Sequence, residues 1–242
     1  MKFSHTFEVD THDTDLNGVA TATAVMRYIQ ESADLQHEAY GPTLPSLREE
    51  GLGFILCRVC LDLPLPLYAR DVVTAVTWLK EARGYAYQRY TALYKNGTLA
   101  AAMNATWGVM DLEARRLERV ERVPLGFGCE DEVLTVAAPA RFRIPRELPL
   151  TEVGKRTVRY SDCDLNRHLN NTRYPSVLLD YLPRSLIGLR PTALTVNYLH
   201  EHRLGDAFTV YHAESDGADL FRTVLADGTV GCEGRIVLAP IE

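Results

Sequence analysis

A carboxylate, an amide and an imidazole alternate in the short stretch Asp164-Leu-Asn166-Arg-His168. In an extended or turn-like loop this spacing projects the three side chains to one side of the backbone. A predicted helix follows directly, and its N-terminus offers free N–H groups and the positive end of a dipole. Such groups stabilise the oxyanion of a tetrahedral transition state. The stretch therefore indicates an acyl-transfer site, with Asn170 and Asn171 beside the oxyanion donors.

The same spacing also fits a capping network in which His168 bonds to Asp164. A poorer copy of the motif distinguishes the two readings, because Asp13-Thr-Asp15-Leu-Asn17 precedes Asp162-Cys-Asp164-Leu-Asn166 by 149 positions throughout. Capping alone would serve both copies equally, yet the copies differ where chemistry would occur. The matched pairs that differ are His168 and Val19, Asn170 and Thr21, and Asn171 and Ala22. We interpret this as a duplicated fold with one active half.

The surrounding pattern predicts the same α+β unit twice, a strand followed by a long helix and an antiparallel meander. The expected helices are residues 23–40 and 171–182, with Asn171 or Thr172 as the second N-cap. The expected strands are residues 54–63, 71–79, 85–94 and 99–110, then 193–199, 207–214, 220–226 and 229–238. Asn96-Gly97 and Asp227-Gly228 mark matching hairpin turns. We predict domains at 1–130 and 153–242 joined by a linker at 131–152, and a short surface helix at 113–122.

Composition narrows the class of protein. With 46% hydrophobic residues, no apolar run of membrane-spanning length and no secretory signal, the 242-residue chain is expected to be globular, without a membrane span. Its net charge of −6 argues against nucleic-acid binding, although residues 139–190 carry ten cations and five anions. Five scattered cysteines fit a cytoplasmic protein. Cys57 and Cys60 are expected to be packing residues, since positions three apart on a strand face opposite sides.

The second-half string Asp164-Leu-Asn166-Arg-His168-Leu-Asn170-Asn171-x-x-Tyr174 closely resembles the signature of the plant and bacterial acyl-acyl carrier protein thioesterases. The resemblance covers essentially the whole chain and implies two tandem hot-dog folds. It also implies that the carboxylate, amide and imidazole are functional. The segment Tyr198-Leu-His200-Glu201-His202 is similar to the family's Tyr-x-x-Glu-Cys context, which assigns the proposed base to Glu201. His202, which we expect as a neighbour of the site, replaces the family's cysteine, and this departure argues against a cysteine nucleophile.

These features lead to a hypothesis of direct attack by water on a thioester. Glu201 would be the general base, with a pKa raised by partial burial. Asn166 and His168 would position water and substrate, and Asp164 would orient one of them. The small residues near the first helix start, Val19, Ala20, Ala22 and Ala24, would form an acyl-chain tunnel. No metal and no cofactor are expected, because the histidines lack ligand spacing.

The leading prediction is a hydrolase that releases free fatty acid from acyl carrier protein. Three alternatives remain open from the sequence: an acyl-coenzyme A thioesterase of the same fold, a hydroxyacyl-thioester dehydratase, and a non-catalytic acyl-binding module. The basic segment within residues 139–190 would attract acyl carrier protein or coenzyme A, because both carriers are anionic. A monomer and a homodimer are both compatible with the fused halves.

Overall fold

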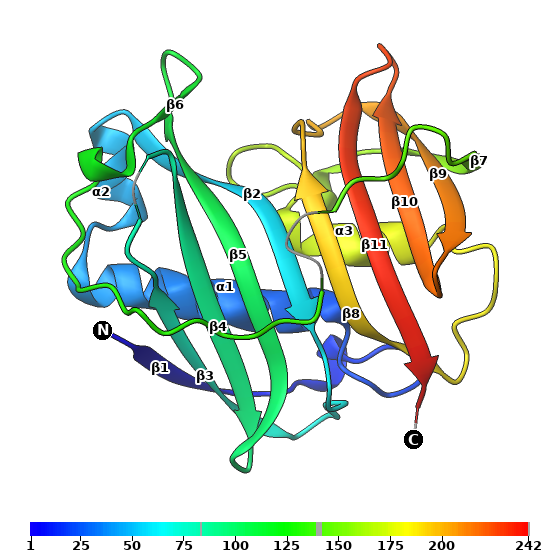
Figure 1. Cartoon of the computed structure of the whole chain (residues 1–242), viewed down its shortest axis with the longest axis horizontal. Helices are drawn as coiled ribbons and strands as arrows, with labels where there is room; N and C mark the ends of the chain where they lie inside the picture. Colours follow the sequence, from blue (N-terminus) through cyan, green and yellow to red (C-terminus); the bar gives the residue numbers. More distant parts are fainter. Residues whose placement is uncertain (83, 139–141, 242) are drawn as a thin grey trace.

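The computed structural model describes residues 1–82, 84–138 and 142–241. Its strands form one antiparallel sheet that contains both halves of the chain (Figure 1). The first-half elements are β1 (Phe3–Glu8), α1 (Ala22–Tyr40), α2 (Leu44–Glu49), β2 (Leu52–Asp62), β3 (Val72–Leu79), β4 (Ala86–Lys95), β5 (Thr98–Asp111) and β6 (Arg116–Glu118). The second-half elements are β7 (Thr151–Thr157), α3 (Tyr174–Leu179), β8 (Leu189–Tyr198), β9 (Ala207–Ser215), β10 (Ala218–Leu225) and β11 (Val230–Pro240).

The strand order shows the duplication directly. It runs β1-β3-β4-β5-β2-β8-β11-β10-β9-β7, so each half has the same order when read inward from its own edge. The two halves meet where β2 pairs antiparallel with β8, with Val59 opposite Val196 and Leu61 opposite Leu194. Each half is an antiparallel sheet curved around a helix, and the predicted tandem hot-dog α+β fold is confirmed.

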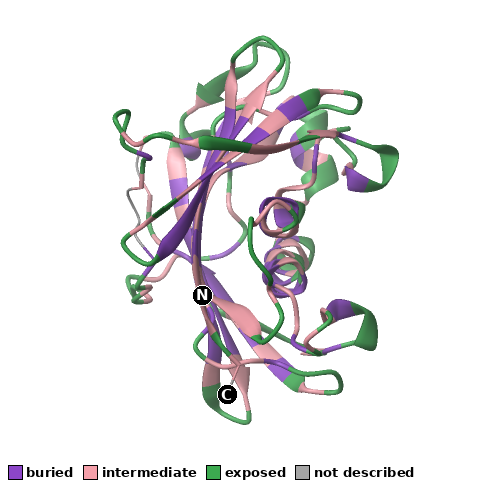
Figure 2. Cartoon of the chain, turned by 90° about the vertical axis from the view of Figure 1, so that its right-hand side faces the viewer, coloured by how far each residue is buried: buried purple, intermediate pink, exposed green. Residues whose placement is uncertain are grey.

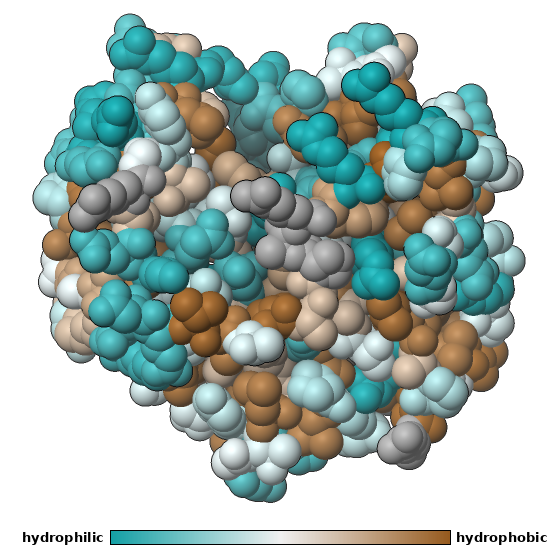
Figure 3. All heavy atoms as spheres, viewed as in Figure 1, coloured by the Kyte–Doolittle hydropathy of each residue, from teal (hydrophilic) through white to brown (hydrophobic). Residues whose placement is uncertain are grey.

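The two helices, α1 and α3, lie side by side on one face of the sheet. Many residues of the helices and of the strands are buried (Figure 2). Met26 and Ile29 of α1 and Leu178 of α3 are fully buried and belong to one apolar cluster that includes strands of both halves. Burying such side chains supplies the main driving force for folding. On the view of Figure 3, hydrophilic and hydrophobic side chains are mixed rather than separated into large areas.

Local chemistry sets where α1 begins and ends. The Thr21 hydroxyl accepts a hydrogen bond from the Ala24 N–H at 3.0 Å, which caps the N-terminus. At the other end Gly41 adopts a positive φ of 73° and its N–H donates to the His37 carbonyl. Glycine adopts this conformation without steric cost, so the helix stops there.

The second helix is shorter than predicted. Residues 171–173 form a 3₁₀ turn capped by Asn170, whose side-chain oxygen accepts from the Thr172 N–H and hydroxyl, and α3 proper has six residues. Pro175 lies in the first turn of α3, where its missing N–H costs little. Beyond Leu179 the Tyr181 and Leu182 N–H groups donate to the carbonyls of Leu178 and Leu179 in single turns, before Pro183. The expected caps Asn171 and Thr172 are therefore wrong by one or two residues.

The segment after β5 is not the surface helix that we predicted at 113–122. The Asp111 carboxylate accepts the N–H groups of Glu113 and Ala114, and Arg115 has a positive φ of 52°. These contacts turn the chain back into β6, which pairs with β5, and a 3₁₀ turn follows at Val120–Arg122.

Between the halves, residues 131–138 and 142–150 cross the sheet without forming a helix or strand (Figure 1). The carbonyl of Glu132 accepts from the Trp78 indole N–H at 2.9 Å, Asp62 accepts from the Ala138 N–H at 3.0 Å, and the carbonyl of Phe142 accepts from Asn197 at 2.6 Å. These residues thus contact β3, β2 and β8 in turn. The domain limits at residues 130 and 153 stay a prediction.

Candidate functional site

The two motif copies fold into the same loop. In the first copy the Asp15 N–H donates to the Val19 carbonyl at 2.9 Å. In the second copy the matching Asp164 N–H donates to the His168 carbonyl at 3.0 Å. Gly18 and its counterpart Arg167 both have positive φ, 75° and 63°. The repeat in the sequence is therefore a repeat in backbone geometry.

The Asp164 side chain accepts hydrogen bonds from the backbone of its own loop. One carboxylate oxygen accepts the N–H of Asn166 at 2.8 Å and the N–H of His168 at 3.4 Å. Asp15 makes the same pair of contacts to Asn17 and Val19, at 2.8 and 3.2 Å. The contact of Asp164 with His168 is therefore to the main chain and not to the imidazole, and the first-half copy has the same arrangement.

His168 and Glu201 meet directly. The His168 Nε2 atom lies 3.2 Å from a carboxylate oxygen of Glu201, and the two side chains are 28% and 29% exposed. The loop that carries His168 and the segment after β8 that carries Glu201 are held together by a bridge between His168 and Arg203 and by the Leu169 N–H donating to the His202 carbonyl at 2.7 Å. The pairing that the sequence only implied is thus present, in a place that water reaches.

The second Glu201 oxygen is shared by two arginines. Arg115, from the turn before β6, lies 2.7 Å away, and Arg203 donates from Nε at 2.9 Å. Burial alone would raise the pKa of Glu201, but Arg203, His168 and Arg115 outweigh burial and hold this pKa below its ordinary value. The expected raised pKa is therefore wrong in direction, since nearby positive charge dominates partial burial.

The hydrogen bonds at the start of the second helix distinguish between the two expected oxyanion donors, Asn170 and Asn171. The Asn170 N–H donates to the Asp162 carbonyl at 2.9 Å, and its side-chain oxygen caps the turn, so both groups are engaged. The Asn171 carbonyl accepts from the Tyr198 hydroxyl at 2.9 Å. Within the described residues no partner is found for the Asn171 N–H, which leaves it as the free donor at this helix end.

His202 does not face this group. Its ring is fully buried, with Tyr174 on Nδ1 at 2.8 Å and Thr223 on Nε2 at 3.0 Å, and Gly231 packs against it. Burial lowers the pKa of His202 to about 4, so the ring is neutral at physiological pH. The residue that we expected as a site neighbour is a core histidine, because successive side chains of an extended segment point to opposite sides.

A cavity of about 410 Å³ lies between the halves beside this loop. Asn166, Asn170 and Asn171 line it from the second half, and Arg48 of α2 donates to the Asn166 side-chain oxygen at 2.7 Å across the boundary. The first-half lining residues are Gln30, Ala33, Asp34, His37, Leu44, Arg48, Phe54, Leu79, Arg89 and Trp107. Asn166 therefore lies at the mouth of a pocket whose body is built by the first half.

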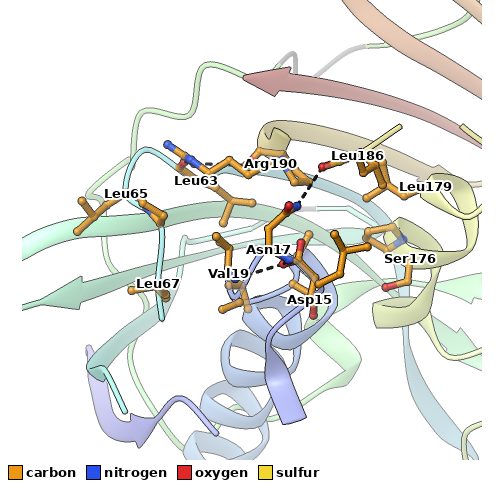
Figure 4. A pocket seen from close by; sticks show the side chains of 18 of the residues that line it. Asp15, Asn17, Val19, Leu63, Leu65, Leu67, Ser176, Leu179, Leu186 and Arg190 are labelled. Atoms are coloured by element: carbon orange, nitrogen blue, oxygen red, sulfur yellow. Dashed lines mark hydrogen bonds between the residues drawn. The ribbon is translucent and has the colours of Figure 1, made fainter. Parts of the chain in front are cut away.

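The small first-half residues line a different cavity. Val19, Ala20 and Ala22 surround about 260 Å³ of space beside Ser176 and Leu186 (Figure 4). Asn17 closes it by donating to the carbonyls of Leu186 and Leu189, at 3.0 and 3.1 Å. The two cavities share no lining residue, so the expected tunnel at the first helix start does not adjoin Asn166; its use by an acyl chain stays a prediction.

Comparisons with known families match both halves. The model of the acyl-ACP thioesterase N-terminal domain matches residues 1–123, and that of the C-terminal domain matches residues 150–235. The chain belongs to the acyl-ACP thioesterase family. This confirms the resemblance that the motif around His168 indicated.

Individual members of the acyl-ACP thioesterase family are distant. A chloroplastic palmitoyl-acyl carrier protein thioesterase of Gossypium hirsutum is 25% identical over 217 residues, and an oleoyl enzyme of Arabidopsis thaliana is 24% identical over 233. These alignments cover 83% and 85% of this chain but 52% and 61% of the relatives, so the chain spans little more than half their length.

Solved structures of acyl-ACP thioesterases have the same fold. One from Bacteroides thetaiotaomicron superposes with a TM-score of 0.88 at 20% identity and covers 98% of both chains. The 12:0-ACP thioesterase of Umbellularia californica superposes with a TM-score of 0.82 at 16% identity, covering 99% of this chain and 98% of that one.

Several charged residues at the site carried no sequence signal. Arg48, Arg115 and Arg203 reach it from separate elements, and only the pairing of distant segments in the fold brings them together. The basic segment at 139–190 is in part used internally: Arg156 pairs with Asp162 and Arg184 with Asp219. Arg141 lies outside the described residues. Among the residues that are described, no cluster suited to a metal ion and no membrane-spanning helix occurs.

Cys57 and Cys60 have the packing role that we expected. Both lie on β2 and neither is in a disulfide; Cys60 is buried and Cys57 half-buried. Burial raises the pKa of each thiol, which leaves them protonated and poorly nucleophilic.

Proposed function

We propose that this chain hydrolyses the thioester of an acyl group carried on acyl carrier protein, with water as the nucleophile. One observation carries the proposal: the imidazole of His168 is paired with the Glu201 carboxylate at 3.2 Å, on a loop whose Asn166, Asn170 and Asn171 line a cavity built by both halves. Membership of the acyl-ACP thioesterase family supports the same reaction class.

The geometry favours His168 as the group that takes the proton, with Glu201 as its partner. In the Nε2–H tautomer the ring donates to Glu201 and keeps the Nδ1 lone pair for a water molecule. No hydrogen bond to Nδ1 occurs within the described residues. Glu201, held ionised by two arginines, stabilises the imidazolium that forms, as the carboxylate of a catalytic triad does.

The remaining steps follow from this assignment. Water attacks the thioester carbonyl carbon as it gives its proton to His168, and the Asn171 N–H stabilises the oxyanion, a contribution of about 3–4 kcal/mol for a typical donor. Collapse of the intermediate breaks the C–S bond, and the imidazolium returns the proton to the thiolate. The products are a free carboxylic acid and the carrier thiol.

The charge around the site supports an anionic carrier. The guanidinium groups of Arg48, Arg115 and Arg203 surround the loop, and those of Arg115 and Arg203 are more than half exposed. Exposed positive charge attracts an acidic partner before contact. An acyl carrier protein and coenzyme A are both anionic, so the carrier is the part of the proposal that most needs a direct comparison.

The test supplies one acyl group on acyl carrier protein and on coenzyme A and measures free thiol and free acid. We expect equal amounts of thiol and acid, and a higher kcat/KM for the protein carrier. A higher value for coenzyme A would replace the carrier assignment. Loss of water without thiol would indicate a dehydratase, and saturable binding without products a binding module. A cytoplasmic location and the monomeric or dimeric state stay predictions.

A further inference from the structure

Polar side chains form part of the wall of the 410 Å³ cavity, beside apolar ones such as Leu44, Phe54 and Leu79, and a plain alkyl chain does not require them. Gln30, Asp34 and His37 follow each other at helical spacing on the cavity side of α1, and Arg89 of β4 lines the cavity from the sheet. A cavity that received only methylene groups would be expected to present apolar side chains, because an unpaired buried polar group costs free energy.

Arg89 is the most buried of these groups. Its side chain is 3% exposed, yet it donates only to neutral partners: Gln36 at 2.7 Å, Thr77 at 3.1 Å and the His37 Nε2 at 3.1 Å. His37 is held in this acceptor role because its Nδ1 lies 3.0 Å from the Pro42 carbonyl. Burial lowers the pKa of Arg89 to about 10, so the guanidinium stays charged at neutral pH.

Asp34 provides the complementary acceptor. It interacts electrostatically with Arg89, but the two form no ion pair within the described residues. Burial raises the pKa of Asp34 to about 6, with Glu31 adding to the shift. A carboxylate and a guanidinium therefore line one cavity without an ion pair between them, and the Asp34 carboxylate has no hydrogen bond from the part of the chain that the structure describes.

We propose that this cavity selects acyl groups that carry a hydroxyl on the chain, with the hydroxyl accepting from Arg89 and donating to Asp34. A hydroxyl fits both partners because it is donor and acceptor at once. A carboxylate would suit Arg89 but would face the negative charge of Asp34. The inference rests on the proposed function and names the substrate class of the same site.

The position of the hydroxyl follows from the course of α1. Gln30 and Asp34 line a neighbouring cavity of similar volume together with Asn170, whereas His37 is about 10 Å beyond Gln30 along the helix. A thioester carbonyl at the Asn171 N–H therefore directs its acyl chain along α1 toward Arg89. The hydroxyl belongs on the chain beyond the carbons next to the thioester.

The experiment compares decanoyl groups on acyl carrier protein that bear a hydroxyl at successive positions with unsubstituted decanoyl. For at least one distal position we expect kcat/KM about tenfold or more above that of the unsubstituted chain, because a site with buried polar partners disfavours a ligand that leaves them unpaired. Asp34→Leu and Arg89→Met should each reduce this ratio to near one.

Leu79→Val is the matched control, since Leu79 lines the same cavity without polar contacts, and it should keep the ratio. Thermal unfolding of each variant establishes that it is folded, and Asp34→Leu carries the test if Arg89→Met does not fold. Equal or faster hydrolysis of unsubstituted decanoyl would overturn the inference, as would a preference that survives both substitutions.

Direct binding separates this inference from the proposed function. Calorimetry with free hydroxydecanoic and decanoic acids should show tighter binding of the hydroxy acid, and Asp34→Leu should abolish the difference. If no acyl-carrier substrate is hydrolysed but this difference is found, the proposed function fails and the ligand class stands. Hydrolysis together with equal binding of the two acids would sink the ligand class alone.

Discussion

At the scale of single residues, Glu201 is controlled by its neighbours. Two arginines occupy one carboxylate oxygen and His168 the other. This arrangement keeps the carboxylate ionised where burial alone would favour its protonated form. We therefore expect these arginines to influence how the proposed activity depends on pH.

Arg203→Gln should move the acidic limb of the pH profile upward. Arg203 is the largest influence that lowers the pKa of Glu201, so its removal raises that pKa, and Glu201 becomes protonated at a higher pH. The proposed mechanism needs both the unprotonated His168 ring and the ionised Glu201 carboxylate, and the loss of activity due to Glu201 then begins at a higher pH as pH falls. The measurement is kcat/KM against pH for both proteins.

Arg116→Gln is the control for this prediction, because Arg116 makes a similar exposed ion pair with Glu118 at 3.1 Å. Its pH profile should match that of the wild type. An unchanged acidic limb in Arg203→Gln would mean that Glu201 does not determine it.

Sequence reasoning located His168 and Glu201 but not what surrounds them. The motif and the segment around Tyr198 carry the residue types of the pair, and the fold brings them to 3.2 Å. Arg115 and the direction of the His202 ring depend on how a turn and an extended segment lie in space. A one-dimensional pattern does not contain that information.

At the scale of elements, the motif loop has the same supporting hydrogen bonds in both halves. Asp15 and Asp164 each accept two backbone N–H groups of their own loop. The hairpin turn at Asn96-Gly97 was predictable because it depends on local residue types. The short α3 was not, since its 3₁₀ turn depends on how Asn170 caps it.

Asp164→Ala and Asp15→Ala form a matched pair. Each should lower the free energy of unfolding by about 0.5–2 kcal/mol, because each frees two N–H groups of equivalent loops. Only Asp164→Ala should also reduce kcat, since only its loop carries His168. Urea denaturation and steady-state kinetics on both variants test this, and equal loss of kcat in the two would contradict the assignment of one active half.

At the scale of the whole molecule, the halves share one sheet and one apolar core. Val59 and Val196 lie opposite each other in the β2–β8 pairing and are both fully inaccessible. The internal repeat predicted two similar units, but it did not reveal which strands join them. It also did not predict that the chain around Glu132 and Ala138 would cross the sheet, because those contacts link residues far apart in sequence.

Val196→Ala should therefore destabilise both halves together. We expect a loss of about 2 kcal/mol from the cavity it creates. Both tryptophans, Trp78 and Trp107, belong to the first half, so their fluorescence reports on the half that is not mutated. The fluorescence transition should shift with the circular dichroism transition, and a fluorescence midpoint equal to that of the wild type would show that the halves unfold independently.

The proposal that the His168–Glu201 pair hydrolyses an acyl thioester is tested most directly with the wild type and Glu201→Gln. The measurement is the release of thiol and fatty acid from acyl-loaded acyl carrier protein. Glu118→Gln serves as a control, as Glu118 is also ion-paired with arginines but has no histidine contact. The account predicts matched release of thiol and acid by the wild type and the control, and turnover at least about a hundredfold slower in folded Glu201→Gln. Wild-type turnover in Glu201→Gln would contradict it.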